Sequence, residues 1–196
     1  RVRVACSPAP ASGAASTTLP DTAMSDDDLL ETTDLLDLAL LGAGHDAPLD
    51  LDRVTLRVRT FCAPWLTPTT EVVEGRVAAL LVRRWVRLDG QRVEVTAAGR
   101  SALRSLMLRP LRAGTHELRF CLENLKLAFI DLVDESEREV IGRELLAARQ
   151  RCLACIGGLA ASCDPDRPSL QACLSLRRRL RTAEVEVMAE ALALPS

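Results

Sequence analysis

Residues 80–104, LLVRRWVRLDGQRVEVTAAGRSALR, constrain the fold more than any other part of the chain. The Asp89-Gly90 pair is a turn signal, because aspartate-glycine accepts the positive φ that lets two strands fold back with a matching twist. After the turn, valines alternate with charged residues, as in a half-buried strand. Thr96 then offers a hydroxyl to the free amides at the start of a new helix. An apolar helix, a hairpin and a second helix in this order predict the C-terminal half of a winged helix-turn-helix.

The charge of the chain is unevenly distributed. Residues 51–112 hold 12 arginines and five acidic residues, a net charge of +7, whereas the remainder holds 13 basic and 22 acidic residues, a net charge of −9. A basic segment in an acidic chain is typical of a domain that binds nucleic acid, although a solvated basic face without a partner is the alternative. Hydrophobic residues make up 48% of the chain but aromatic residues only 3%, so the core must be built from leucine, valine and alanine, which favours helices.

Residues 1–23 are rich in alanine, serine, threonine and proline and show no periodicity. We therefore expect a disordered tail or an over-extended start ahead of Met24. No apolar run approaches the roughly 18 residues needed to cross a bilayer, so we expect no membrane partner. Seven cysteines, an odd number, do not suggest a disulfide framework, and a reduced, cytoplasmic setting is the simplest expectation.

Hydrophobic periodicity predicts a mainly α fold with a small β wing. A winged helix-turn-helix domain is expected over residues 24–112, with helices at 29–41, 50–61, 67–81 and 96–108. Thr67 and Pro68 are expected to be the N-cap and first residue of the third helix. A helical dimerisation domain is expected over residues 113–196, with helices at 117–133, 135–159 and 169–192.

The last predicted helix has an apolar stripe but little aromatic mass. The stripe consists of Cys173, Leu176, Leu180, Ala183, Val187 and Ala191. Three helices of this kind cannot readily bury their apolar faces against one another alone, and packing against a second copy would cover them. We therefore predict a homodimer formed through the C-terminal helices.

Two groups of residues are candidates for contacts with double-stranded DNA. The exposed side of the helix at 67–81 is expected to enter the major groove and to contact base edges and phosphates through Thr69, Thr70, Glu71, Glu74 and Arg76. The arginines beside the hairpin are expected to reach backbone phosphates, namely Arg83, Arg84, Arg87 and Arg92. The alternative for the helix is an ordinary solvated face.

Cys152 and Cys155 form a CxxC pair, and in a helix such residues share one face. A thiol or metal sensor is one interpretation, but no histidine lies near in sequence, so buried, inert thiols are favoured. No phosphate-binding loop and no spacing of acid, base and nucleophile appears in the sequence. We therefore expect no catalytic, cofactor or metal site, and not an enzyme.

Three segments carry a resemblance to a known family. They are residues 35–41, LLDLALL; residues 93–100, VEVTAAGR; and in the C-terminal half residues 117–120, ELRF, with 174–192, LSLRRRLRTAEVEVMAEAL. In order and spacing they resemble the first helix, the wing end and the helical domain of the PadR family of bacterial transcriptional regulators. The resemblance covers nearly the whole chain after Met24. It implies a DNA-binding homodimeric repressor, released from its operator by a small-molecule effector that enters between the two domains.

The chain departs from the family pattern at three places. Residues 51–53, LDR, stand where members place a glycine-tyrosine pair, Glu74 stands in place of a tyrosine of the recognition helix, and Arg84 replaces a glycine before the first wing strand. Glu71 and Glu74 add acid to a surface that would face phosphate. These departures favour an alternative function, a winged-helix interaction or adaptor protein that has lost specific DNA binding.

Overall fold

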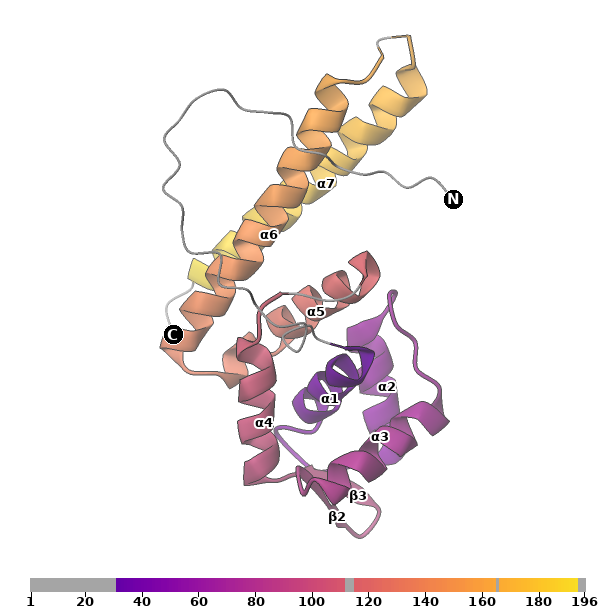
Figure 1. Ribbon diagram of the computed structural model, residues 1–196, viewed down its shortest axis with the longest axis vertical. Coiled ribbons are helices and arrows are strands. Elements are labelled where there is room, and N and C mark those ends of the chain that lie inside the picture. The colour runs from indigo at the N-terminus through magenta and orange to yellow at the C-terminus, as the bar shows by residue number, and fades with distance from the viewer. Residues whose placement is uncertain (1–30, 112–114, 165, 194–196) are drawn as a thin grey trace, which may run out of the picture.

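The computed structural model describes residues 31–111, 115–164 and 166–193. Its elements are α1 (Thr32–Ala43), β1 (Leu49–Asp50), α2 (Leu51–Cys62), α3 (Thr70–Val82), β2 (Val86–Asp89), β3 (Arg92–Val95), α4 (Ala97–Leu108), α5 (His116–Ala128), a 3-10 turn at Ile130–Leu132, α6 (Glu135–Ala161) and α7 (Pro168–Ala193). Figure 1 shows α1–α4 and the small sheet grouped at one end and the long α6–α7 hairpin rising from them. The predicted fold class, mainly α with a small β wing, is confirmed.

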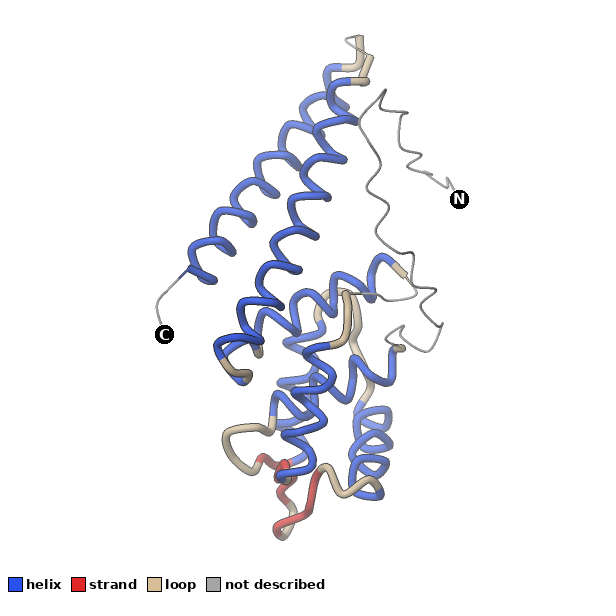
Figure 2. Tube along the Cα trace, turned by 60° about the vertical axis from the view of Figure 1, so that its left-hand side comes forward, coloured by secondary structure: helices blue, strands red, loops and turns tan. Residues whose placement is uncertain are grey.

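The wing is a three-stranded antiparallel sheet with the strand order β1-β3-β2. Val86 pairs with Val95 and Asp89 with Arg92 across the predicted hairpin, and Gly90 has the positive φ of 62° that the turn requires. The third strand, β1, pairs Leu49 with Val93. It was not predicted, because two residues are too few to show an alternating pattern. Figure 2 shows the strands together at one end of the molecule, remote from the loop that joins α6 to α7 at the other end.

The third helix begins at Thr70, so the prediction that Thr67 and Pro68 start it is wrong. The Thr69 hydroxyl accepts a hydrogen bond from the Val72 amide at 3.4 Å and caps the helix. Pro68 instead lies in the preceding turn, where its carbonyl accepts a hydrogen bond from Arg59 Nε at 2.8 Å. A contact from α2 thus holds the chain just ahead of α3.

Other boundaries differ by smaller amounts. The helix predicted at 117–133 ends at Ala128 and continues as the 3-10 turn to Leu132. The helix predicted at 135–159 runs through Gly157 and Gly158 to Ala161, because α7 packs along it. The helix predicted at 29–41 is observed as α1, and residues 1–30, including the predicted tail, lie outside the described residues.

One hydrophobic core connects the winged unit to the next helix. Leu38 of α1, Leu80 of α3 and Leu125 of α5 are all fully buried in it. At its edge the Phe129 ring meets the Phe61 ring edge to face at a centroid distance of 5.0 Å. Helix α5, which the predicted division at residue 112 assigns to the second domain, therefore packs with α1 and α2. The predicted boundary between two domains at residue 112 stays a prediction.

A buried lysine joins three elements beside this core. Lys126 of α5 is fully buried and donates to the Arg109 carbonyl at the end of α4. Its ammonium lies 3.6 Å from the carboxylate of Glu144 on α6, which also accepts from the Leu111 amide at 2.7 Å. Burial lowers the pKa of Lys126, and Glu144 opposes that shift. These contacts fix the base of the α6–α7 hairpin against α4 and α5.

No helix of the described ranges is long and apolar enough to cross a membrane.

The close contact of α4 with the wing generates a stability prediction. A Cβ on Gly99 would lie 2.0 Å from the Trp85 carbonyl oxygen, so Gly99→Ala should destabilise the protein by at least about 2 kcal/mol. Gly75 is the matched control, because a Cβ there meets nothing within 4 Å and alanine should stabilise the helix by up to about 1 kcal/mol. Urea unfolding of both variants measures the difference. Equal stability of the two variants would contradict the observed packing of α4.

Candidate nucleic-acid interface

The outward face of α3 carries acidic and small side chains. Glu71, Gly75, Ala78 and Val82 follow one another along this face at helical spacing, and all four are exposed. Glu74, also exposed, flanks them. The face therefore offers two carboxylates and some apolar surface to a partner. A carboxylate can accept a hydrogen bond from the amino group of cytosine, but it repels phosphate.

The two threonines at the start of α3 are partly engaged within the protein. The Thr69 hydroxyl serves as the N-cap, and the Thr70 hydroxyl lies 3.4 Å from Arg59 Nη2. Hydrogen bonds from its own backbone amide and from the Thr69 hydroxyl hold the pKa of the Glu71 carboxyl below its usual value. Glu71 therefore presents a fixed negative charge at the end of the helix where amides are exposed.

Arg76 is bound to a buried carboxylate instead of facing outward. Its Nε lies 2.9 Å from Asp37 Oδ1 and its Nη2 lies 2.5 Å from Asp37 Oδ2. The Arg76 side chain is 18% exposed and that of Asp37 only 1%. The expectation that Arg76 lies on the exposed side of the helix is therefore wrong. Burial raises the pKa of Asp37, while hydrogen bonding and charge from Arg76 oppose the shift.

The root of the wing carries two arginines with different surroundings. Arg83 Nη1 lies 3.4 Å from Asp37 Oδ2, and its guanidinium lies 5.0 Å from the centroid of the Trp85 ring. Half of the Arg83 side chain is still exposed. Arg84 is exposed and adopts a φ of 59°, the left-handed conformation that glycine adopts without strain. Both side chains can therefore reach a ligand at the wing, and Arg84 does so from a strained backbone.

The arginines of the strands are exposed but shared with carboxylates. Arg87 of β2 forms two hydrogen bonds, of 2.9 and 3.0 Å, with Glu94 directly opposite on β3. Arg92 of β3 lies 3.3 Å from Asp50 on β1. The two arginine side chains are 67% and 62% exposed. The sheet therefore orients both guanidinium groups without enclosing them.

Most of the positive charge of this segment is paired inside the protein. Within described residues 51–111, Arg53 and Arg84 are the arginines whose side chains have no recorded hydrogen bond or ion pair. Arg104, for example, binds Asp134 and Glu137 of α6. The net charge counted from the sequence thus overstates the charge available to a nucleic acid, because it does not reveal which carboxylates the fold brings near.

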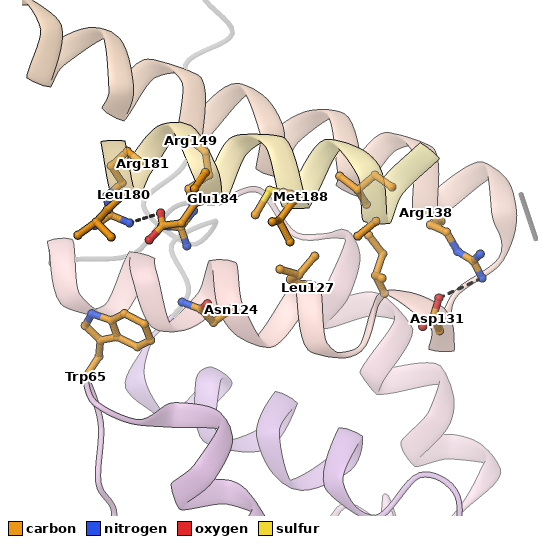
Figure 3. Close-up of a pocket in the computed structure, with 15 residues that line it drawn as sticks. Trp65, Asn124, Leu127, Asp131, Arg138, Arg149, Leu180, Arg181, Glu184 and Met188 are labelled. Atoms are coloured by element: carbon orange, nitrogen blue, oxygen red, sulfur yellow. Dashed lines mark hydrogen bonds and ion pairs between the residues drawn. The ribbon is translucent and has the colours of Figure 1, made fainter. Parts of the chain in front are cut away.

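A groove between α5, α6 and α7 is a second candidate site that the sequence did not reveal. Its volume is about 910 Å³, and Figure 3 shows side chains from the three helices and Trp65 converging on it. The Trp65 and Phe120 rings stack at a centroid distance of 6.1 Å. The guanidinium groups of Arg149 and Arg181 lie 4.9 and 5.0 Å from the Phe120 ring. This end of the groove therefore combines aromatic rings with guanidinium groups, and Glu123 and Glu184 balance the charges of the two arginines. Its lining residues are far apart in the sequence, and no local motif marks it.

The cysteines of α6 and α7 are more exposed than expected. Cys155 and Cys173 are exposed, and Cys152 and Cys163, the latter between the two helices, are half-buried. The expectation of buried thiols is therefore wrong for Cys155 and is met only in part by Cys152. The distal half of α6 extends beyond the winged unit, which leaves this region open. In the part of the chain that the structure describes, no group of three or more His, Cys, Asp or Glu residues could hold a metal ion.

Comparison with known proteins finds matches among solved structures. No protein-family model matches the chain, and no curated protein matches it. Bacillus subtilis PadR is 16% identical, with a TM-score of 0.39 over 83% of this chain and 95% of that chain. Its complex with p-coumaric acid is 17% identical, with a TM-score of 0.38 over 83% and 96% of the two chains. Its complex with operator DNA is 16% identical, with a TM-score of 0.34 over 81% and 98%.

The Asp37 ion pair can be tested by removing one partner. Asp37→Ala leaves Arg76 largely buried without a counter-charge, so we expect a loss of about 3 kcal/mol in the free energy of unfolding. Replacing both residues, as Asp37→Leu with Arg76→Leu, should recover much of that loss, because no buried charge remains. Glu94→Ala is the control, since its exposed pair with Arg87 should contribute less than about 1 kcal/mol. A similar small effect for Asp37→Ala would show that Asp37 does not hold α3.

Proposed function

We propose that this chain is a non-enzymatic, DNA-binding transcriptional regulator that acts as a homodimer. The observation that carries the proposal is the arrangement of exposed arginines around the wing. Arg83, Arg84, Arg87 and Arg92 lie within one hairpin and its root, next to the outward face of α3. A helix and a basic wing held in fixed relation are the parts that winged helices use on a duplex.

In this proposal α3 enters the major groove with its N-terminal end leading. Thr69 and Thr70 contact phosphate or base edges, and Glu71 and Glu74 accept hydrogen bonds from cytosine amino groups. The four arginines at the wing bind backbone phosphates, which supplies affinity that depends on salt and not on sequence. Arg76 acts as a positioning residue, because its bond to Asp37 sets the rotation of α3.

Regulation in this proposal uses the helical part of the chain. The C-terminal helices join two copies and set the spacing of their recognition helices. The groove between α5, α6 and α7 would admit a small-molecule effector, and Trp65 on its wall lies in the turn after α2. Occupation of the groove would shift the hairpin relative to the winged unit, change the spacing and release the operator, so that the resting state represses transcription.

The adaptor alternative rests on a specific observation. The outward face of α3 carries Glu71 and Glu74. The single arginine of this helix, Arg76, forms an ion pair with Asp37 instead of facing outward. Such a face suits a basic or apolar protein partner better than it suits phosphate.

Salt-titrated fluorescence anisotropy tests the two functions. The full chain is titrated against a duplex from upstream of its own gene and against a scrambled duplex. A regulator should bind the upstream duplex at least about 10³-fold more tightly than the scrambled one. Weak binding to both duplexes that disappears at moderate salt would contradict the proposal and leave the adaptor function.

The phosphate contacts of the wing lead to a further prediction. Replacing Arg84, Arg87 and Arg92 by alanine should weaken binding to both duplexes alike. The slope of log K against log salt should decrease by about 0.9 for each phosphate that the variant no longer neutralises. Arg178→Ala is the control, because Arg178 is an exposed arginine of α7 outside the winged unit. An unchanged salt slope in the triple variant would remove the wing from the interface.

A further inference from the structure

Helix α7 covers only one of its apolar faces within the chain. Met188 is buried, and Leu192 packs on Gly142 of α6. On another face, Leu176, Leu180 and Val187 are 53%, 57% and 65% exposed. This open stripe, which we call the α7 stripe, consists of Cys173, Leu176, Leu180, Ala183 and Val187, all of them exposed. A continuous row of exposed apolar side chains on a long helix needs a partner surface.

The spacing of the α7 stripe is that of a coiled-coil seam. Its members follow one another at alternating intervals of three and four residues, which is the pattern of the a and d positions of a heptad. The four positions that flank such a seam are all charged. Arg177 and Glu184 lie along one flank, and Arg179 and Glu186 lie along the other. Each flank therefore has an arginine in the N-terminal half and a glutamate in the C-terminal half.

We infer that the α7 stripe pairs with the same stripe of a second copy in antiparallel orientation. Leu180 lies opposite the partner's Ala183, and Leu176 lies opposite the partner's Val187. In this one register Arg177 faces the partner's Glu184, and Arg179 faces the partner's Glu186. The inference rests on the homodimer of the proposed function and specifies its orientation and register.

Charge complementarity selects the antiparallel orientation. A parallel pair would place Arg179 beside the partner's Glu184 but would leave Arg177 and Glu186 opposite alanines. The antiparallel pair gives a partner to all four flanking charges. No intrachain partner is found for Arg177, Arg179 or Glu186 among the described residues, and all three are exposed. Glu184 already contacts Arg181 and Arg149 within its own chain, so the partner's Arg177 would be the third arginine beside this carboxylate.

The pairing also brings the partner helix to the groove. Leu180, Ala183 and Val187 belong both to the α7 stripe and to the wall of the groove between α5, α6 and α7. Figure 3 shows Leu180 and Glu184 on the side of α7 that faces this space. A partner helix on the stripe therefore contacts the α7 wall of the groove. A ligand bound in the groove would contact the dimer interface directly.

Charge reversal tests the register. Arg179→Glu places glutamate against glutamate twice in each dimer, and we expect the dimer dissociation constant to rise about tenfold in sedimentation equilibrium. The double variant Arg179→Glu with Glu186→Arg should restore the wild-type value, because the antiparallel register pairs these two positions. Arg178→Glu is the matched control, since Arg178 lies off the seam and its two flanks. Failure of the double variant to restore dimerisation, or a monomeric wild-type chain, would overturn the inference.

Crosslinking tests the orientation independently of stability. Glu190→Cys lies opposite the partner's Cys173 in the antiparallel register, so a short bismaleimide should join the two chains. In the variant Glu190→Cys with Cys173→Ser, the two engineered thiols are about 25 Å apart along the helices, and the covalent dimer should be absent. Persistence of the crosslink in that variant would indicate a parallel pair and would overturn the inference.

DNA binding is measured separately, so that the two proposals can fail independently. A dimer of this register that does not bind DNA would support the inference and contradict the DNA-binding function. DNA binding by a monomer would overturn the inference and leave the DNA-binding function in place.

Discussion

The arrangement of the candidate interface depends on one buried carboxylate. Asp37 lies in the middle of α1, almost without solvent contact, and a charge so placed is tolerated only when it is paired and hydrogen-bonded. Its partners come from two parts of that interface, Arg76 within α3 and Arg83 just after it. One side chain of the first helix therefore sets both the rotation of α3 and the position of the wing root. The same pairing withdraws Arg76 largely and Arg83 in part from any external partner.

Helix α5 makes the winged unit and the hairpin mechanically continuous. It contributes Leu122 and Leu125 to the core of α1–α3, and through Lys126 it binds the end of α4 and Glu144 of α6. At its other end Phe120 contacts Trp65, which follows α2, and Arg149 of α6. Because interiors are closely packed and deform little, a shift of α6 and α7 must be accommodated at these contacts. This gives a physical route between the groove and the turn that leads into α3.

The net charge counted along the sequence differs from the positive charge that the folded protein can offer to a partner. Residues 51–112 carry a net charge of +7, yet Arg87 and Arg92 each face a carboxylate in the sheet, and Arg104 faces two on α6. Exposed ion pairs are weak, so Arg87 and Arg92 can exchange their carboxylates for phosphate at little cost. Arg76 cannot do so, because leaving Asp37 unpaired in the core is costly. Exposure, and not formal charge, separates the arginines that can serve an interface from those that hold the fold.

Local signals in the sequence were sufficient for the hairpin at Asp89-Gly90, the N-cap at Thr96 and the periodic helices, because each depends on residues within a turn or two of one another. The fold class followed from the order of these elements, and the α7 stripe followed from the periodicity of its apolar residues. Contacts between distant residues decided the rest. Arg59 binds the Pro68 carbonyl just ahead of the Thr69 N-cap, and Asp37 binds Arg76 from 39 residues away. The groove and the exposed face of α7 exist only because α6 covers one side of that helix, and periodicity shows that a face is apolar without showing what covers it.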